Sequence, residues 1–297
     1  MASLKEVRVR IKSVMSTQQI TKAMKMVAAA KLRRSQEAVM QLRPYAQKLN
    51  SIMSNVASDS SLDLSENPYS EVRAEEKILL IVVTSDRGLC GGFNSNILKA
   101  VNVLLTNKYK LQSDKGNVTL LPLGKKGNDF YAKRKINVIP SYSSIFTSLN
   151  FEEARKVAER AMNCFIAKEY DKVEVVYNEF KNVATQIVKV KQLLPIVQSE
   201  DKTMVKGSKN VDYIFEPNKI DIMKDLIPKS LKITLYGALL ESAAAENGAR
   251  MTAMDKATEN AGELLKDLRL SYNRTRQAAI TKEILEIVGG AEALANN

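Results

Sequence analysis

The sequence predicts an α/β protein in which a long antiparallel coiled coil of the N- and C-terminal helices carries an inserted Rossmann-like α/β domain. Three observations lead to this fold class. Both ends of the 297-residue chain repeat apolar residues at spacings of three and four, the pattern of one helix packed along another. All seven prolines lie between Pro44 and Pro228, so residues 229–297 contain none. Between the ends, apolar strand-like runs alternate with helical segments.

The N-terminal seam predicts one helix, or two collinear helices, over residues 3–57. The spacing passes through Pro44 without losing phase, so we expect a kink there. The alternative is two helices that meet at Pro44, because proline favours the first turn of a helix. The polar run 16–19 is expected to interrupt the seam and shift its phase. The expected seam residues are Leu4, Val7, Ile11 and Val14, then Ile20, Met24 and Val27, and finally Val39, Leu42, Ala46, Leu49, Met53 and Val56.

The C-terminal helix is predicted to carry two stripes in different phases. The first is Met254, Ala257, Ala261, Leu264 and Leu268, and the second is Ile280, Ile284, Ile287 and Ala291. The face toward the partner is therefore expected to rotate between these stripes. A helix over most of residues 229–297 would be about 100 Å long at about 1.5 Å per residue. Such a length exceeds one ordinary domain and predicts a partner helix or a surrounding protein.

The middle of the chain reads as an α/β layer with a mostly parallel sheet. Residues 77–84 form a continuous apolar strand, as in a sheet buried on both faces. The further expected elements are a helix over 94–109, a strand over 118–123, a short helix after Gly124-Lys125-Lys126-Gly127, a helix over 151–169, a strand over 172–180 and a more exposed strand over 186–194. The predicted division is a helix over 1–57, a linker over 58–76, the α/β domain over 77–210, with a loop over 198–210, and the lead-in and terminal helix over 211–297.

Composition excludes several classes of site. The chain has no histidine, which removes the commonest general base and zinc ligand. Cys90 and Cys164 are too few for a disulfide framework and indicate a reducing compartment. The longest apolar run, residues 78–83, is far shorter than the roughly 20 residues that span a bilayer. No metal-ligand spacing or paired carboxylates stand out, so we expect no metal, no cofactor and no catalytic residue, and no secretory signal is visible.

The net charge of +12 is concentrated at the N-terminus. Residues 1–60 carry eleven Lys or Arg against three Asp or Glu, whereas residues 229–297 carry nine of each. A basic arm favours an acidic partner such as an acidic protein surface, anionic lipid or nucleic acid. Few aromatic side chains interleave with these charges to stack on bases, so an acidic protein is favoured over nucleic acid.

A glycine-rich turn between the first strand and the next helix is the one stretch that resembles a chemical motif. It contains Asp86, Arg87, Gly88, Cys90, Gly91 and Gly92. Glycines there could cradle a phosphate at a helix N-terminus, but the order matches neither dinucleotide nor Walker patterns. A structural turn is the favoured interpretation, with glycines supplying positive φ and close backbone approach. Arg87 could lower the pKa of Cys90, but with no histidine a buried structural cysteine is favoured.

Three stretches together resemble the gamma subunit of F-type ATP synthases. Residues 20–31, ITKAMKMVAAAK, resemble the N-terminal helix of that family. Residues 86–92, DRGLCGG, are similar to its motif after the first strand, and residues 278–291, AAITKEILEIVGGA, resemble its C-terminal signature. All three follow the order and spacing of the family, and the resemblance covers the whole chain, although residues 100–215 add little.

The resemblance implies a central rotor shaft that is not itself catalytic. Its terminal helices would form a coiled coil inside a ring of three alpha and three beta subunits, and its foot would contact the epsilon subunit and the membrane ring of c subunits. Rotation driven by proton flow would couple the c-ring to ATP synthesis. The expected location is the cytoplasmic face of a bacterial cell membrane, with membrane association only through the c-ring.

The resemblance also implies contact residues. Arg276, Gln277, Thr281 and Glu283 align with the region that engages the beta subunit. Met24 and Lys25 align with the part of the shaft that passes the moving beta domains, although many relatives carry an acid in place of Lys25. Tyr213 and Glu216 align with contacts to epsilon and the c-ring. The rival interpretations are a nucleotide-binding α/β protein that uses the glycine turn and a nucleic-acid-binding protein with helical arms.

Overall fold

A computed structural model describes residues 4–57, 67–134, 136–196 and 219–295 of the chain. These residues divide into two compact units. Unit 1 contains residues 1–28 and 251–297, and unit 2 contains residues 29–250. Two long helices, α1 (Leu4–Ala57) and α6 (Lys219–Ala295), each contribute residues to both units. The predicted terminal helices are thus confirmed, and the two units are described separately below.

Unit 2 is built on a five-stranded sheet with the order β3-β2-β1-β4-β5. Its strands are β1 (Ile78–Val83), β2 (Val118–Leu123), β3 (Asn137–Val138), β4 (Lys172–Phe180) and β5 (Gln186–Leu194). The first four strands run parallel, and β5 pairs antiparallel with β4. The mostly parallel sheet is therefore confirmed. The two-residue strand β3 was not predicted, because so short a segment shows no period.

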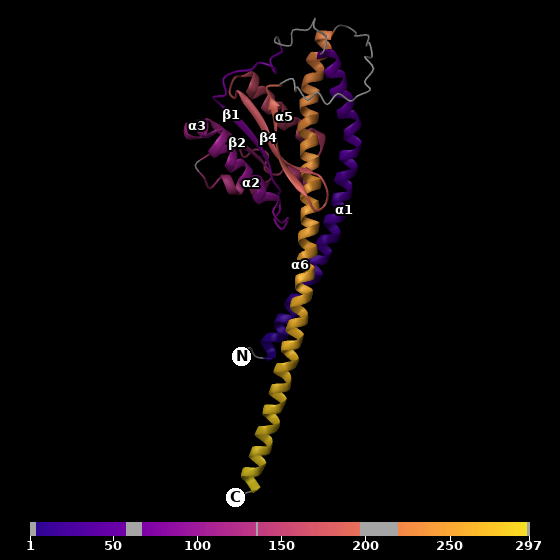
Figure 1. The fold of residues 1–297 in the computed structure, drawn as a ribbon, viewed down its shortest axis with the longest axis vertical. Coiled ribbons are helices and arrows are strands. Elements are labelled where there is room, and N and C mark those ends of the chain that lie inside the picture. Colours follow the sequence, from indigo (N-terminus) through magenta and orange to yellow (C-terminus); the bar gives the residue numbers. More distant parts are fainter. Residues whose placement is uncertain (1–3, 58–66, 135, 197–218, 296–297) are drawn as a thin grey trace. The chain divides into compact units, whose positions relative to one another are not determined.

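Helices cover both faces of this sheet (Figure 1). They are α2 (Phe93–Val103), which continues as a π-helix over Leu104–Lys108, α3 (Lys110–Asp114), α4 (Lys125–Tyr131), a 3-10 turn over Ile145–Thr147, and α5 (Phe151–Ile166). All six residues of β1 are buried, as expected of a strand covered on both sides. The apolar run that predicted this strand therefore reflects its central place in the sheet.

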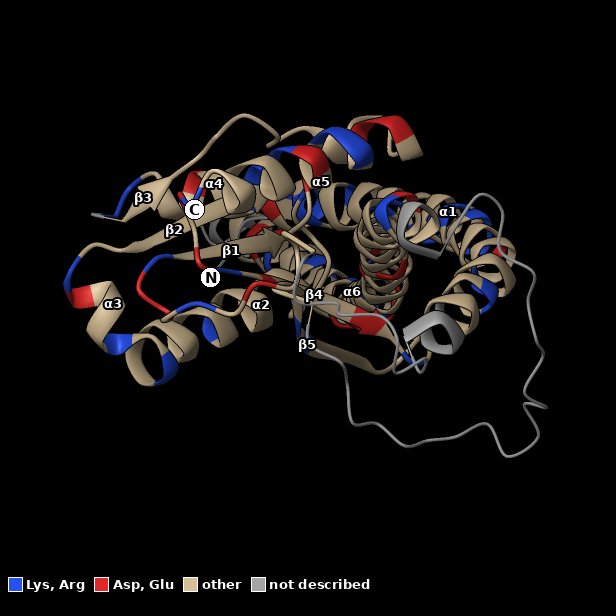
Figure 2. Ribbon diagram, turned by 90° about the horizontal axis from the view of Figure 1, so that it is seen from above, with Lys and Arg blue, Asp and Glu red and all other residues tan. Residues whose placement is uncertain are grey.

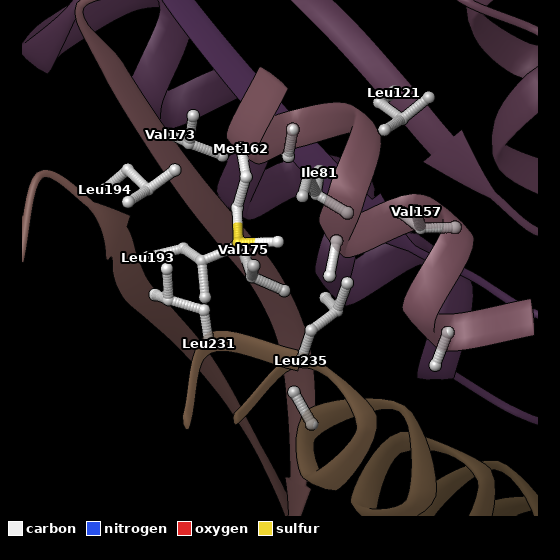
Figure 3. Close-up of a cluster of buried hydrophobic side chains, with 14 of the residues drawn as sticks. Ile81, Leu121, Val157, Met162, Val173, Val175, Leu193, Leu194, Leu231 and Leu235 are labelled. Carbon is white, nitrogen blue, oxygen red and sulfur yellow. The ribbon is translucent and has the colours of Figure 1, made fainter. Parts of the chain in front are cut away.

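One core of unit 2 lies between the sheet, α5 and the segment of α6 near Leu231 and Leu235 (Figure 3). In Figure 3, Met162 of α5 lies beside Val175 of β4, with Leu193 close by. A second core lies on the opposite face, where alternate strand residues such as Leu80 and Val176 pack with α2. The segment of α6 around Ala245 and Ala249 joins that second core. Residues 219–250 of α6 are thus part of the α/β unit as well as of the helical pair.

The two long helices pack antiparallel. In unit 1, Thr258 contacts Thr21 and Asp255 contacts Lys25, so the residue number falls on α6 as it rises on α1. In unit 2, a Cβ on Gly237 would lie 3.6 Å from Leu42 Cδ2, in ordinary contact. The predicted antiparallel pairing is therefore confirmed. Helix α1 continues through Pro44 and α6 through Pro228, so the alternative of two helices meeting at Pro44 is wrong.

The predicted phase shift in α1 is also wrong. Ile20 and Val27 are each 57% exposed, whereas Thr21 and Ala28 are buried. The positions at seam spacing between Val14 and Ala28 are Gln18, Thr21 and Lys25. The seam therefore runs through the polar stretch without changing phase. The prediction failed because it required every seam residue to be apolar.

A similar error of one residue affects the first stripe of α6. Met254 and Ala261 are buried as predicted, but Leu264 is 39% exposed and the adjacent Leu265 is 5% exposed. The buried positions therefore continue from Ala261 to Leu265, a step of four, and Leu264 faces outward. The second stripe is exposed throughout in this chain, with Ile280 at 45% and Ile287 at 71%.

The division into 1–57, 58–76, 77–210 and 211–297 stays a prediction. Residues 58–66 of the proposed linker and the proposed loop 198–210 lie outside the described residues. The proposed lead-in residues 213–217 lie outside them as well. The structure does place the start of α6 at Lys219, ahead of Pro228.

Candidate functional site

The glycine-rich turn after β1 is held by its own side chains. Asn94 Oδ1 accepts a hydrogen bond from Ser85 N at 3.0 Å, and Asn94 Nδ2 donates to Ser85 Oγ at 2.7 Å. Ser85 Oγ in turn donates to the carbonyl oxygen of Arg87 at 2.7 Å. Gly91 takes positive φ, as the structural interpretation requires, and so does Leu89, whose side chain is 64% exposed. The turn therefore presents Leu89 to the outside.

Cys90 lies under this turn and is buried. Burial raises the pKa of its thiol, and the hydrogen bond between Cys90 Sγ and Ser85 Oγ offsets only part of that effect. A raised pKa keeps the sulfur protonated, which makes a reactive thiolate unfavourable. The structure therefore supports a packing role for Cys90.

In the stretch Gly124-Lys125-Lys126-Gly127, both glycines are needed because the chain approaches Thr84 closely. Gly124 has φ +106°, and a Cβ there would lie 2.2 Å from the Thr84 carbonyl oxygen. A Cβ on Gly127 would lie 2.7 Å from Thr84 Oγ1, which accepts a hydrogen bond from Gly127 N at 2.9 Å. Both glycines therefore make room for Thr84, and no ligand is needed to explain them.

Two of the backbone N–H groups that could bind a phosphate near these turns are already used. Ser85 N donates to Asn94, and Lys125 N donates to Asp86 Oδ1 at 3.2 Å. Asp86 Oδ2 also accepts from Thr147 Oγ1 at 3.4 Å. An acidic side chain at the start of α4 would repel a phosphate. This geometry favours the structural turn over the nucleotide-binding interpretation.

Helix α6 contacts the glycine-rich turn through one arginine. Arg250 Nη2 donates to the carbonyl oxygens of Arg87 and Gly88 at 3.2 and 3.5 Å. The same nitrogen lies 2.6 Å from Glu246 Oε1, and both side chains are 13% exposed. Burial raises the pKa of Glu246, and the charge of Arg250 opposes that shift. The motif turn is therefore a docking point for α6 within unit 2.

The predicted C-terminal contact residues lie on α6 in unit 1. Arg276, Gln277, Thr281 and Glu283 are all exposed. Thr281 Oγ1 donates to the carbonyl oxygen of Gln277 at 2.9 Å, which turns the hydroxyl toward its own helix. The side chains of Arg276 and Glu283 stand in solvent in the isolated chain, where they are free to meet charged groups of another protein.

Comparison with known proteins identifies the family. A family model described as ATP synthase matches residues 3–294. The ATP synthase gamma chain of Cytophaga hutchinsonii is 57% identical over 296 residues, which covers 100% of both chains. That of Christiangramia forsetii is 50% identical over 294 residues, or 99% of each chain.

The chain belongs to the ATP synthase gamma-chain family.

Solved structures agree with this membership. The chain resembles one in the central stalk and c-ring structure of the Tetrahymena thermophila mitochondrial ATP synthase, at 28% identity and a TM-score of 0.56. That match covers 80% of this chain and 99% of the other. A chain of the Euglena gracilis mitochondrial enzyme shares the fold at a TM-score of 0.66 and 21% identity, over 98% and 94% of the two chains. As a gamma chain, this protein is a non-catalytic component of the central stalk of F-type ATP synthase.

The structure describes most of the contact residues that the resemblance to gamma chains predicted. Met24 and Lys25 lie on α1, both half-buried, and Lys25 is paired with Asp255. From Asp255 to Arg276 is roughly 30 Å along α6, at about 1.5 Å per residue. Because Lys25 pairs with Asp255, the predicted contacts on α1 and the predicted contacts near Arg276 lie at different levels along α6. Tyr213 and Glu216 lie outside the described residues.

The sequence analysis missed several residues of this gamma chain. Arg250 and Glu246 were not singled out, because an i,i+4 pair on a helix is common and the carbonyl partners of Arg250 are 162 or 163 residues away. Gln18 was taken as part of an interruption over residues 16–19, and Thr21 was not placed on the seam. A strict count of the three-four spacing from Val14 to Ala28 would have found them.

Charge on the gamma chain follows the sequence expectation for α1. Lys and Arg, blue in Figure 2, recur along this helix, whose acidic residues are Glu6 and Glu37. Among the described residues, no helix combines the length and apolar content needed to cross a bilayer. The described residues also contain no group of three or more His, Cys, Asp or Glu placed to hold a metal ion.

Proposed function

We propose that this gamma chain is the rotor shaft that couples rotation of the c-ring to ATP synthesis at a ring of three alpha and three beta subunits. An asymmetric shaft presents a different face to each beta subunit, and so shifts three otherwise equivalent sites by different contact energies. The chain itself supplies no catalytic residue in this scheme. It acts by position alone.

Arg276, Gln277, Thr281 and Glu283 are the proposed contacts with the beta subunit. Their exposure on α6 supports this assignment. An exposed arginine forms a strong bidentate, charge-assisted pair with a carboxylate. Met24 and Lys25 are assigned to the part of the shaft that passes the beta domains, and Tyr213 and Glu216 to contacts with epsilon and the c-ring.

The observation that carries the proposal is the apolar surface at the end of α6. Ile284, Leu285, Ile287 and Val288 are between 50% and 71% exposed in this chain. Within the described part of the chain, nothing covers them. Contiguous exposed apolar side chains of this kind mark a protein interface. A surrounding ring of subunits would bury them, as the shaft model requires.

Location follows from the same scheme. The c-ring lies in the membrane, so a shaft standing on it is peripheral and is held to the membrane only indirectly. We therefore place the chain at the cytoplasmic face of a bacterial cell membrane. Proton flow through the membrane sector would drive its rotation.

Reconstitution with and without this chain tests the proposal. The complete complex in sealed vesicles should acidify the lumen when ATP is added outside. A complex assembled without this chain should lose that acidification, and adding the purified chain during assembly should restore it. Normal ATP-driven proton pumping without the chain would refute the proposal. Binding of ATP to the isolated chain in a calorimetric titration would favour the nucleotide-binding alternative.

A further inference from the structure

The helical pair of unit 1 has a polar stretch in the middle of its seam. Between the apolar seam residues Val14 and Ala28, the seam positions of α1 are Gln18, Thr21 and Lys25. Opposite them on α6 lie Asp255, Thr258 and Gly262. We call these six residues the polar layer. Polar groups at seam positions cost stability, and in coiled coils they set the register of the helices.

Every side chain of the polar layer is partnered across the helices. Lys25 Nζ lies 2.5 Å from Asp255 Oδ1. Thr258 Oγ1 donates to Thr21 Oγ1 at 2.8 Å, and Thr21 Oγ1 donates onward to the carbonyl oxygen of Gln18 at 3.0 Å. Gln18 Nε2 reaches the carbonyl oxygen of Thr258 at 3.5 Å. The layer is thus a connected network rather than a set of solvated side chains.

Gly262 makes room for this network. A Cβ at that position would lie 3.0 Å from Gln18 Nε2, closer than side chains normally approach. The amide of Gln18 therefore occupies space that a larger residue would take. This close fit holds only in the observed pairing of the two helices.

The ion pair gives the layer its selectivity. An apolar seam of three-four spacing repeats every seven residues, so it tolerates a slip by one heptad. A slip that placed Lys25 opposite Gly262 would leave both Lys25 and Asp255 without their charge partner. Since 40% of the Lys25 side chain and 44% of the Asp255 side chain are exposed, the pair is modest in strength and acts by discriminating between pairings.

We propose that Lys25 is a positioning residue: Asp255 holds its ammonium group within the helical pair, and this contact sets the orientation in which α1 presents the neighbouring Met24. The inference rests on the proposed rotor function and revises one part of it. There, Lys25 was assigned to the part of the shaft that passes the beta domains. Here its partner is Asp255, and its effect on coupling passes through the geometry of the shaft.

A charge swap in the assembled complex tests this role. Lys25→Asp and Asp255→Lys each place like charges together, and the double variant restores an opposite pair. We expect each single variant to lower the number of protons pumped per ATP hydrolysed, because losing an exposed pair shifts the equilibrium between helix pairings by roughly 1.5- to 5-fold. The double variant should recover most of the loss. Lys12→Asp combined with Asp255→Lys is the matched control, since Lys12 is an exposed cation of the same helix, and it should not recover coupling.

Two outcomes would overturn the inference. If the double variant pumps no better than Lys25→Asp, the lysine acts directly on another subunit. If both single variants pump normally, the pair has no positioning role. Subunit content of each purified complex is measured first, and the neutral variants Lys25→Gln and Asp255→Asn replace any that fails to assemble. The charge swap tests only the role of Lys25, whereas reconstitution with and without the chain tests the rotor function. A negative result in one experiment therefore does not decide the other.

Discussion

Arg250 and Glu246 form an ion pair one turn apart on α6, and the same Arg250 nitrogen bonds to the glycine-rich turn that follows β1. The glycine-rich turn was considered a candidate ligand site in the sequence. The pair links this turn to the long C-terminal helix. The motif turn therefore serves assembly of the α/β unit around α6. Of its glycines, Gly91 takes positive φ, a backbone conformation that favours glycine.

Removing the arginine should destabilise the chain. We expect Arg250→Ala to lower the free energy of unfolding by about 3 kcal/mol, because Glu246 would be left buried without its charge partner. Arg250→Lys keeps the charge but lacks the forked geometry, so its loss should be smaller. Denaturant unfolding of the purified full-length chain measures both. Equal stability of Arg250→Ala and the parent would show that the pair is not stabilising.

Gly124 and Gly116, both at positive φ, should respond very differently to alanine. At Gly124 the new Cβ would meet the Thr84 carbonyl oxygen at 2.2 Å, whereas at Gly116 nothing lies within 4 Å. Gly116→Ala should cost about 1 kcal/mol, from backbone strain alone. Gly124→Ala should cost about 3 kcal/mol or more, because strain and steric overlap add. Similar thermal unfolding of the two variants would contradict the close approach at Thr84.

The adjacent leucines of α6 test the corrected seam. Leu265 is 5% exposed and Leu264 is 39% exposed. We expect Leu265→Ala to destabilise the helical pair by about 2–3 kcal/mol, from lost burial and the cavity left behind. Leu264→Ala should cost less than about 1 kcal/mol. Amide hydrogen exchange along α6 separates the two variants, and a larger effect at Leu264 would restore the original sequence prediction.

Glu241 should make stability depend on pH. It lines a cavity of about 150 Å³ with Arg43, Tyr177 and Lys191, and one of its carboxylate oxygens is buried without a hydrogen-bond partner. Burial, with Glu179 nearby, raises its pKa above 4.5, while Arg43, Lys191 and Lys189 oppose the shift. The folded state thus keeps the proton to a higher pH than the unfolded state.

The sign of that dependence follows from linkage. A raised carboxyl pKa contributes stability that is present below about pH 4.5 and is lost as the pH rises through the folded-state value. Glu241→Gln should remove this contribution to the pH dependence of the free energy of unfolding. The stability of the variant relative to the parent should therefore improve from pH 4.5 to pH 7. Unfolding curves at several pH values measure the difference. A constant offset between the two proteins across this range would exclude the titration.

Arg276→Ala tests the proposed contact with the beta subunit. The side chain is exposed, so the isolated variant should unfold within about 0.5 kcal/mol of the parent. In the complete complex it should weaken coupled proton pumping or assembly, because a carboxylate on the other subunit would lose its charged partner. Unchanged pumping and unchanged stability of the complex would remove this assignment.

Sequence patterns predicted the sheet and the two long helices because these elements have clear physical signatures. The continuous apolar run at 78–83 is what a central parallel strand requires, and all of it is buried. The phase of the seams was harder to predict. Leu264 and Leu265 are chemically identical neighbours, and only the position of the other helix decides which one is buried.

The site was less predictable than the fold. Gln18, Thr21 and Lys25 look like a solvated face until Thr258 and Asp255 are placed beside them by a contact more than 200 residues away in the chain. The Arg250 contact with the turn depends in the same way on tertiary structure. The three-four spacing from Val14 to Ala28 indicates these seam positions, but local sequence carries no signal for their partners on α6 or for the partner of Arg250. The resemblance in the C-terminal signature gave the family, and the structure gave the internal contacts.

The exposed isoleucines and leucine at the end of α6 also bear on how a cell must produce this chain. When the chain is made in excess over the subunits that bind it, the exposed apolar end of α6 should cause aggregation or be cut by proteases. Synthesis in amounts matched to those subunits would avoid both aggregation and proteolysis. Overproduction of this chain by itself should therefore yield aggregates or a trimmed C-terminus, whereas joint expression with the enclosing subunits should yield intact material.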